Sequence, residues 1–348
     1  MAETGKYIYG VTNSHARLDF CAPTDSSETE RVYTIPYQGI SAVVSDSEIV
    51  DYTNMRKDDL GRLLVKHQQV IEKVMSLGHT VLPMKFGTFI ENEGAVTDVL
   101  RKGYNLITGI MEKIDNKVEV DVVATWSDIT SVIREVQGEK EIKEFREQLL
   151  SGSKKVTVDD QMKAGLMVQK ALEKKREQHA VQIQSELKAV SQAITEHELM
   201  DDKMVANCAF LLEKLKQDEL ERKVEELNAR FEERLNFRCV GPLPPYSFYT
   251  LDVKKMQYKD LDWAKRKLRL GDFASSQEIK KAYRSAALSS HPDHNPGASG
   301  AEKELDDVKK AYGILTDYGL ACQQADKIDS YSLDEEEFEK NAVLVTVR

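Results

Sequence analysis

The residue types most suited to chemistry lie close together in a short polar run, which holds His291, Pro292, Asp293 and His294. Imidazole and carboxylate groups in such a run are ligands for zinc or manganese. A stable site needs further ligands, and no fourth ligand occurs nearby in the sequence. A turn explains the same residues, so we expect no metal here.

The cysteines offer a second possible chemistry, that of a nucleophile paired with a distant histidine. Cys208 and Cys239 lie in apolar runs typical of strands, where a thiol is usually buried and inert. The four cysteines are far apart and form no CxxC pair, so the spacing of a zinc site or a disulfide framework is missing. This favours a reducing, cytoplasmic compartment.

The usual enzyme signatures are also missing from the sequence. There is no GxxxxGK[ST] loop, no GxGxxG after a strand, no HExxH and no GxSxG. We therefore expect a protein that is not an enzyme, with no catalytic, cofactor-binding or metal-binding residues. A basic segment at 265–269 could contact nucleic acid, but it is short and the chain carries a net charge of -10, so we expect no nucleic-acid partner.

In the first part of the chain, strand patterns alternate with helix patterns. Short apolar runs predict strands, and amphipathic spacing predicts helices at 58–77 and 94–114. The predicted strands lie at 7–11, 40–44, 80–90 and 118–126. This alternation predicts a ferredoxin-like α+β sandwich, followed by an extra helix after Asp128.

The second part begins with a long solvent-facing helix, predicted over 158–194. A strand at 204–212 and a helix at 218–235 follow, then two strands separated by the turn 241–245. From residue 259 to about residue 318 the pattern is purely helical, and a last strand covers 342–347. If this strand completes the sheet begun before the helical segment, that segment is an insertion in the second α+β domain.

Length and composition agree with several domains. The 348 residues, 41% of them hydrophobic, are enough for more than one core. We expect domains at 1–150, at 151–258 together with 338–348, and at 259–325 for the insertion. The beginning of the chain does not resemble a signal peptide and no run of about 18 apolar residues occurs, so we expect neither secretion nor a membrane span.

Three motifs together resemble the GvpL/GvpF family of gas vesicle proteins. They are the sequence YIYG at 7–10, VLPMKFGT at 81–88 and GPLPPYSF at 241–248. The resemblance covers residues 6–252 and implies a cytoplasmic, gas vesicle-associated assembly factor. It implies binding to the small apolar shell protein and to other gas vesicle accessory proteins. The same residues can also be explained by packing, because Met84, Phe86, Tyr246 and Phe248 are of types usually buried, and Gly87 and Gly241 are of a type suited to turns.

The helical insertion contains an amphipathic helix with a basic side. Ile279, Ala282 and Tyr283 share one face, while Lys280, Lys281 and Arg284 project elsewhere. Pro292 ends the helix, and a second helix is predicted over 301–316. Two antiparallel helices joined by a polar loop are expected.

This hairpin resembles the J-domain of DnaJ co-chaperones over residues 262–318. The resemblance implies that Lys280, Lys281 and Arg284 steer toward an acidic surface of a seventy-kilodalton heat-shock chaperone, and that His291, Pro292 and Asp293 engage it to stimulate ATP hydrolysis. Two alternatives stay open. The hairpin could be retained for packing alone, or the chain could be a J-domain co-chaperone whose clients are unrelated to gas vesicles.

Overall fold

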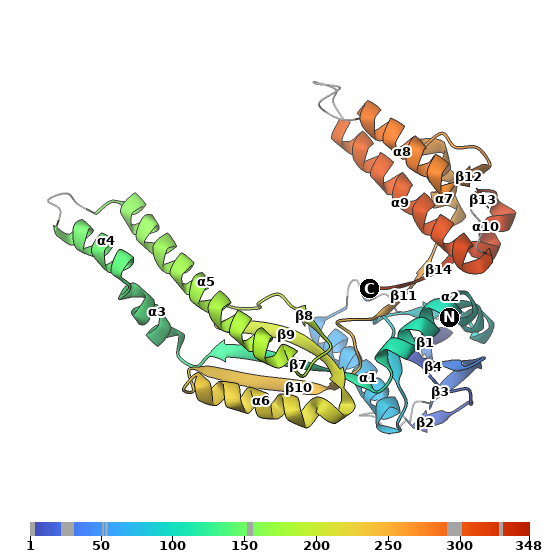
Figure 1. Cartoon of the computed structure of the whole chain (residues 1–348). Coiled ribbons are helices and arrows are strands. Elements are labelled where there is room, and N and C mark those ends of the chain that lie inside the picture. The colour runs from blue at the N-terminus through green and yellow to red at the C-terminus, as the bar shows by residue number, and fades with distance from the viewer. Residues whose placement is uncertain are drawn as a thin grey trace. The chain divides into compact units, whose positions relative to one another are not determined.

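The computed structural model describes residues 4–21, 31–50, 52, 55–151, 156–290, 301–326 and 330–348. The chain forms two compact units. The first unit combines Met1–Lys113 with Tyr249–Arg348, and the second is Ile114–Phe248. Both mix helices with antiparallel strands, which confirms the α+β class (Figure 1).

The N-terminal part of the first unit is built around a sheet with β1 near its middle. The strand order is β2-β3-β4-β1-β5, and β6 also pairs with β1. The strands are β1 (Thr4–Thr12), β2 (Asp19–Cys21), β3 (Arg31–Tyr37), β4 (Ile40–Glu48), β5 (Val81–Pro83) and β6 (Phe89–Ile90). This order differs from that of a ferredoxin-like sheet, because β2, β3 and β4 follow β1 with no helix between them.

Two amphipathic helices accompany this sheet, as the spacing of apolar residues predicted. The helix α1 (Lys57–Ser76) contacts β1 and β5 and buries Val70, Ile71 and Val74. The helix α2 (Glu93–Ile114) buries Val96 and Ile107. Both helices begin and end within a few residues of the predicted limits, because apolar periodicity over about 20 residues is a strong signal.

The run 80–90, predicted as one strand, is in fact two short strands separated by a turn. Gly87 has a φ of +83°, a conformation that side chains with a Cβ rarely adopt. A Cβ added there would lie 2.9 Å from Cε2 of Tyr52. The turn thus requires glycine, which confirms that Gly87 meets a backbone need.

The second unit has the β-α-β-β-α-β topology of a ferredoxin-like fold. Its sheet has the order β10-β7-β9-β8 with antiparallel pairing throughout. Its elements are β7 (Lys117–Trp126), α3 (Ile129–Gln137), α4 (Lys140–Ser151), α5 (Val158–Lys188), β8 (Ala193–Glu196), β9 (Met204–Glu213), the 3₁₀ helix η2 (Lys214–Lys216), α6 (Gln217–Arg230) and β10 (Leu235–Leu243).

The unit boundary differs from the expected one. The strand β7 lies within the range 1–150 that we expected to form the first domain, but it pairs with β9 and β10 of the second unit. A strand pattern in the sequence does not reveal which other strands it pairs with, so the sequence places β7 with its neighbours along the chain. The division falls between residues 113 and 114 instead.

The helices α3, α4 and α5 form a projection of the second unit that we call the arm (Figure 1). Asp128 caps α3 by accepting bonds from the backbone N–H groups of Thr130 and Ser131. Thr157 and Asp160 form a capping box at the beginning of α5. Near its end α5 buries Ile183 and Leu187 and contacts β9, while its earlier turns contact α3 and α4.

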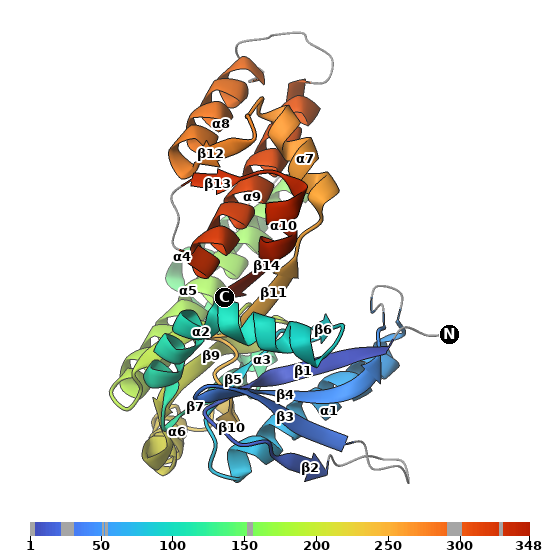
Figure 2. The same ribbon diagram turned by 90° about the vertical axis from the view of Figure 1, so that its right-hand side faces the viewer.

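The rest of the first unit is a C-terminal lobe, residues 251–348. It contains β11 (Leu251–Lys255), α7 (Tyr258–Lys267), β12 (Phe273–Ser275), α8 (Ser276–Ser290), α9 (Ala301–Asp326), β13 (Ser330–Ser332), α10 (Glu335–Asn341) and β14 (Val343–Val347). The interval predicted to be purely helical includes the short strand β12, which pairs with β13. Figure 2 shows α8 and α9 side by side.

The last strand pairs with the strand before the helical segment, but not within the sheet of the second unit. The strand β14 pairs antiparallel with β11, from Leu251 opposite Val347 to Lys255 opposite Val343. These two strands form a separate sheet that belongs to the first unit. The helical segment is therefore inserted between two strands of the first unit, and the expected grouping of 338–348 with 151–258 is not what the structure shows.

Candidate functional site

The predicted helical hairpin is present as α8 and α9. The rings of Tyr283 and Tyr312 stack across it, with centroids 4.3 Å apart and an angle of 26° between their planes. Ile279 of α8 is buried, as are Val308, Ala311 and Leu315 of α9. The face of α8 assigned to the interior from helical spacing is thus the one that packs against α9.

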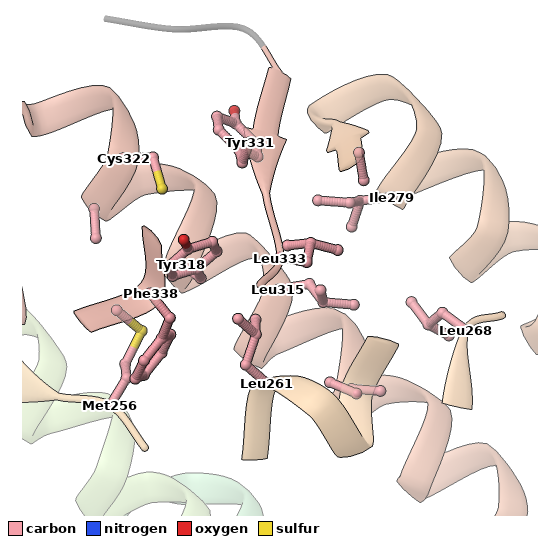
Figure 3. Close-up of a cluster of buried hydrophobic side chains, with 14 of the residues drawn as sticks. Met256, Leu261, Leu268, Ile279, Leu315, Tyr318, Cys322, Tyr331, Leu333 and Phe338 are labelled. Carbon is pink, nitrogen blue, oxygen red and sulfur yellow. The ribbon is translucent and has the colours of Figure 1, made fainter. Parts of the chain in front are cut away.

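A single hydrophobic core joins this hairpin to the rest of the C-terminal lobe (Figure 3). Leu261 and Leu268 come from α7, and Leu315 and Tyr318 come from α9. Phe338 of α10 lies beside Tyr318, with ring centroids 5.6 Å apart. The hydroxyl of Tyr318 donates a bond to the carbonyl oxygen of Ser332. The hairpin is therefore held by elements that lie both before and after it in the sequence.

The basic residues that we expected to bind a partner lie on the outside of α8. Lys280, Lys281 and Arg284 are exposed, on faces other than that of the buried Ile279. Within the described residues, no acidic side chain forms an ion pair with any of the three. His291, Pro292 and Asp293 lie outside the described residues. The structure thus presents the basic side that resemblance to a J-domain implies, and does not test the loop.

The basic segment 265–269 differs, because the charges of Lys265, Arg266 and Lys267 are paired inside the lobe. The ammonium group of Lys265 lies 2.6 Å from the carboxylate of Asp272. Lys267 lies 2.8 Å from Glu304 and 3.2 Å from Asp307. These carboxylates raise the pKa of both lysines. The segment thus joins α7 to its neighbours within the lobe.

The motif 81–88 fastens the C-terminal lobe to the sheet around β1. Met84 is buried and its N–H donates to the carbonyl oxygen of Tyr9, while the N–H of Lys85 donates to that of Leu251. The Lys85 ammonium group also lies 3.0 Å from the carboxylate of Asp252. Packing in the core therefore explains the methionine at position 84, as its apolar character predicted. Lys85 attaches β11, the first strand of the lobe, to this motif.

A cluster of aromatic rings surrounds His67, which sequence reasoning did not single out. Nδ1 of His67 lies 2.8 Å from the hydroxyl of Tyr7, and the rings of Phe86 and Tyr9 lie against the imidazole. Burial lowers the pKa of His67 to about 4, although a hydrogen bond with the backbone of Met84 opposes this. The adjoining cavity measures about 40 Å³, which suits water rather than a substrate.

The motif 241–248 lies against β7 in the second unit. A Cβ at Gly241 would lie 3.0 Å from the carbonyl oxygen of Glu119, so this close approach requires glycine, as expected. Pro244 and Pro245 are buried, and Tyr246 and Phe248 are half-buried. Ser247 donates a hydrogen bond to the carboxylate of Glu119. Sequence reasoning did not select Glu119, because a single glutamate in a strand carries no motif.

Comparison with known proteins assigns the larger part of the chain. The family model described as gas vesicle synthesis protein GvpL/GvpF matches residues 5–250. The chain belongs to the GvpL/GvpF family. Gas vesicle protein F of Nostoc sp. is 24% identical over 247 residues, which is 70% of this chain and 98% of that protein. Gas vesicle protein F of Haloferax mediterranei is 23% identical, over 71% of this chain and 94% of that protein.

Solved structures support the same fold. The crystal structure of gas vesicle protein GvpF from Anabaena sp. has a TM-score of 0.62 at 24% identity, over 70% of this chain and 98% of that one. The structure of GvpF from Microcystis aeruginosa has a TM-score of 0.57 at 22% identity, with the same coverage. At such identities the likeness concerns the fold alone.

The C-terminal lobe has a separate relationship. A DnaJ domain model matches residues 266–319, as the motifs predicted. Chaperone protein DnaJ of Herminiimonas arsenicoxydans is 47% identical over 64 residues, which is 18% of this chain and only 16% of that protein. The GvpL/GvpF part is thus followed by a J-domain, and the elements β13, α10 and β14 come after the match.

Two features are absent from the part of the chain that the structure describes. No helix there is long and apolar enough to cross a membrane. No group of three or more histidine, cysteine, aspartate or glutamate side chains is arranged to hold a metal ion in that part of the chain.

Proposed function

We propose that this chain is an accessory factor of gas vesicle assembly that binds the small apolar shell protein and acts together with other gas vesicle accessory proteins. The observation that carries the proposal is the GvpL/GvpF match over residues 5–250. An apolar subunit must be kept from aggregating before it assembles, because exposed apolar surface and strand edges associate in water. The role proposed for the protein is therefore binding rather than catalysis, at the gas vesicle.

The arm offers an apolar surface that suits such a subunit. Val158, Met162 and Leu166 follow one another at four-residue spacing on α5, and Leu150 lies near them in sequence at the end of α4; all four are between 54% and 74% exposed. A groove of about 360 Å³ between α4 and α5 is lined by Ile142, Leu149, Ala164, Gly165 and Val168, among others. Such a surface supports the docking of an apolar helix.

The J-domain adds a second binding role, the recruitment of a seventy-kilodalton heat-shock chaperone. Lys280, Lys281 and Arg284 form an exposed basic side of α8, which would attract an acidic surface on that chaperone. By resemblance to J-domains, His291, Pro292 and Asp293 would then stimulate its ATPase. The chaperone would hydrolyse the ATP, and the GvpL/GvpF part would bind the shell protein as the client.

Co-expression with a small gas vesicle shell protein tests the leading proposal. We expect more of the shell protein to remain soluble, and part of it to elute together with this chain from a sizing column. If the shell protein aggregates as readily as it does alone, the chain does not act as a factor that holds it, and the proposal fails.

A second candidate function is that of a J-domain co-chaperone for clients unrelated to gas vesicles. The observation that favours it is the 47% identity with DnaJ over the hairpin, much higher than the identity of the GvpL/GvpF part with its relatives. The variant His291→Gln separates the two functions. If the variant loses ATPase stimulation but binds the shell protein as before, the leading proposal is supported. If the unaltered chain stimulates the ATPase but does not bind the shell protein at all, the second function is supported.

A further inference from the structure

A buried carboxylate in the second unit holds the end of the motif 241–248. Glu119 on β7 is 2% exposed. Its Oε2 accepts a hydrogen bond from the backbone N–H of Ser247 at 2.8 Å, and its Oε1 accepts one from the Ser247 hydroxyl at 2.7 Å. Two bonds to one carboxylate fix both the backbone and the side chain of Ser247.

Two further ionisable groups adjoin this contact. Nε2 of His197 lies 3.0 Å from the Ser247 hydroxyl. Asp121 is two residues after Glu119 on β7, so both carboxylates lie on the same face of the sheet. The Oδ1 atom of Asp121 is buried and has no hydrogen-bond partner among the described residues. The contact therefore combines two neighbouring carboxylates, a hydroxyl and an imidazole.

This contact lies where the chain passes between the two units. The chain enters the second unit between Lys113 and Ile114 and leaves it between Phe248 and Tyr249. Glu119 follows the entry closely, and Ser247 comes just before the exit. One carboxylate thus ties the two crossing segments to each other at the edge of the second unit.

The protonation of this site follows from burial and from like charge. Burial raises the pKa of Glu119 to about 7, against the two bonds from Ser247, and the neighbouring Asp121 carboxylate adds to the rise. Burial also raises the pKa of Asp121, while His197 opposes the rise. Two adjacent carboxylates, one of them buried, are most stable when they share one proton.

Few other charges oppose this effect. On the same face, β10 contributes Arg238, which is exposed. Opposite Glu119 and Asp121, β9 contributes the uncharged Leu211 and Ala209, and β8 contributes the uncharged Ala193 and Thr195. Besides Asp121, the ionisable groups on this face of these elements are therefore the half-buried Lys117 of β7, the exposed Glu213 opposite it on β9, His197 and the exposed Arg238.

We propose that Glu119, Asp121 and Ser247 form a proton-dependent latch, which holds residues 243–248 on β7 while the two carboxylates share a proton and releases them when that proton leaves. Loss of the proton places two negative charges side by side, one of them on the buried Glu119. Opening the latch exposes both carboxylates to solvent and relieves this cost.

The direction and size of the effect follow from proton linkage. An exposed glutamate has a pKa near 4.5, whereas the pKa of Glu119 in the closed latch is about 7. The closed form therefore binds the proton more tightly, so closure is favoured in acid and weakens as the pH rises through 7. Between about pH 6 and about pH 8, the equilibrium between closed and open forms should shift toward the open form by about tenfold.

Hydrogen exchange of the Ser247 amide in the full chain tests the latch, because this N–H is itself bonded to Glu119. We expect its protection factor, corrected for intrinsic exchange, to be about tenfold lower at pH 8 than at pH 6. The variant Glu119→Gln removes the titrating group and should abolish this dependence. The control Glu213→Gln, an exposed carboxylate at the end of β9, should leave it unchanged.

A second variant, Asp121→Asn, keeps the test usable if Glu119→Gln does not fold. In Asp121→Asn the like charge is removed, so the fall in protection should become smaller while residues 243–248 remain bound. Equal protection of the wild-type amide at both pH values would overturn the proposal, and so would an unchanged pH profile in Glu119→Gln or in Asp121→Asn. None of these outcomes depends on gas vesicle assembly.

Discussion

The burial of a single histidine makes the stability of the first sheet depend on pH. His67 is 4% exposed and has a pKa of about 4, below the value of 6.5 for a free imidazole. The unfolded chain therefore takes up a proton near pH 6.5 while the folded chain remains neutral at this residue. The contribution of the neutral His67 to the free energy of unfolding is fully present above pH 6.5. It falls by up to about 3 kcal/mol as the pH drops toward 4.

Chemical denaturation at several pH values between about 4 and 7 measures the free energy of unfolding. In His67→Gln this free energy should fall less steeply as the pH drops. His15 is exposed, so His15→Gln serves as the control and should keep the wild-type slope. A slope that survives the removal of His67 would mean that other groups cause it.

Gly87 gives a second test at the same scale. Alanine at this position would have to adopt a φ of +83° and would press on the ring of Tyr52. We expect Gly87→Ala to destabilise the first unit by about 1–3 kcal/mol. The control Gly109→Ala places a methyl group inside α2 with nothing within 4 Å, and should stabilise it by about 0.5–1 kcal/mol. Thermal unfolding midpoints that fall equally in both variants would contradict this account.

Sequence alone identified some of these residues but not their partners. The type of Gly87 and its place in a strand-like run were enough to predict a backbone requirement. His67 and Glu119 were not found, because each acquires its unusual pKa from burial, which residues distant in the sequence bring about. Burial and long-range contacts leave no local pattern, so residues of this kind require the structure.

At the scale of elements, α10 shows that the J-domain here depends on residues beyond its own match. Phe338 is 2% exposed and packs against Tyr258 and Tyr318. We expect Phe338→Ala to destabilise the C-terminal lobe by about 3–5 kcal/mol, because a large buried ring leaves a cavity. Phe273 of the same lobe is 69% exposed, so Phe273→Ala should change stability by less than about 0.5 kcal/mol. Hydrogen exchange across α8 and α9 measures both effects; full protection in Phe338→Ala would refute the dependence.

The arm is the element we expect to contact the shell protein. A charge in its apolar stripe, as in Met162→Glu or Leu166→Glu, should reduce co-elution of the shell protein at least tenfold, because a buried unpaired carboxylate is costly. Val181 lies on the same helix with similar exposure and belongs to a different part of its surface, so Val181→Glu is the matched control. If all three variants bind the shell protein equally well, the stripe is not the contact surface.

The elements themselves were predicted well where the pattern is long and periodic, as in α1 and α2, or where an apolar run is continuous, as in β9. The strand β12 was missed because three residues carry no periodicity, and the run 80–90 was predicted as one strand because its turn has only Gly87 as a signal. Strand pairing could not be predicted either. The alternation of β7 indicates which of its faces is buried, and β14 is a short apolar run, but neither pattern says which sheet the strand joins.

At the scale of the whole molecule, the chain combines a GvpL/GvpF part with a J-domain inserted between β11 and β14. The motif 81–88 holds β11 through Lys85, and the salt bridge from Arg348 to Asp252 ties the last residue to the same strand. The J-domain is therefore fixed to the first unit at both of its ends.

The most direct test of a role in gas vesicle assembly is complementation of a vesicle-forming host that lacks its own GvpF-type protein. The measured quantity is the turbidity of the cells that disappears when pressure collapses their vesicles. Our account predicts that expression of this chain restores it, and that Met162→Glu restores much less of it than Val181→Glu does. The account would be contradicted if cells that contain both the folded chain and the host's shell protein showed no pressure-sensitive turbidity.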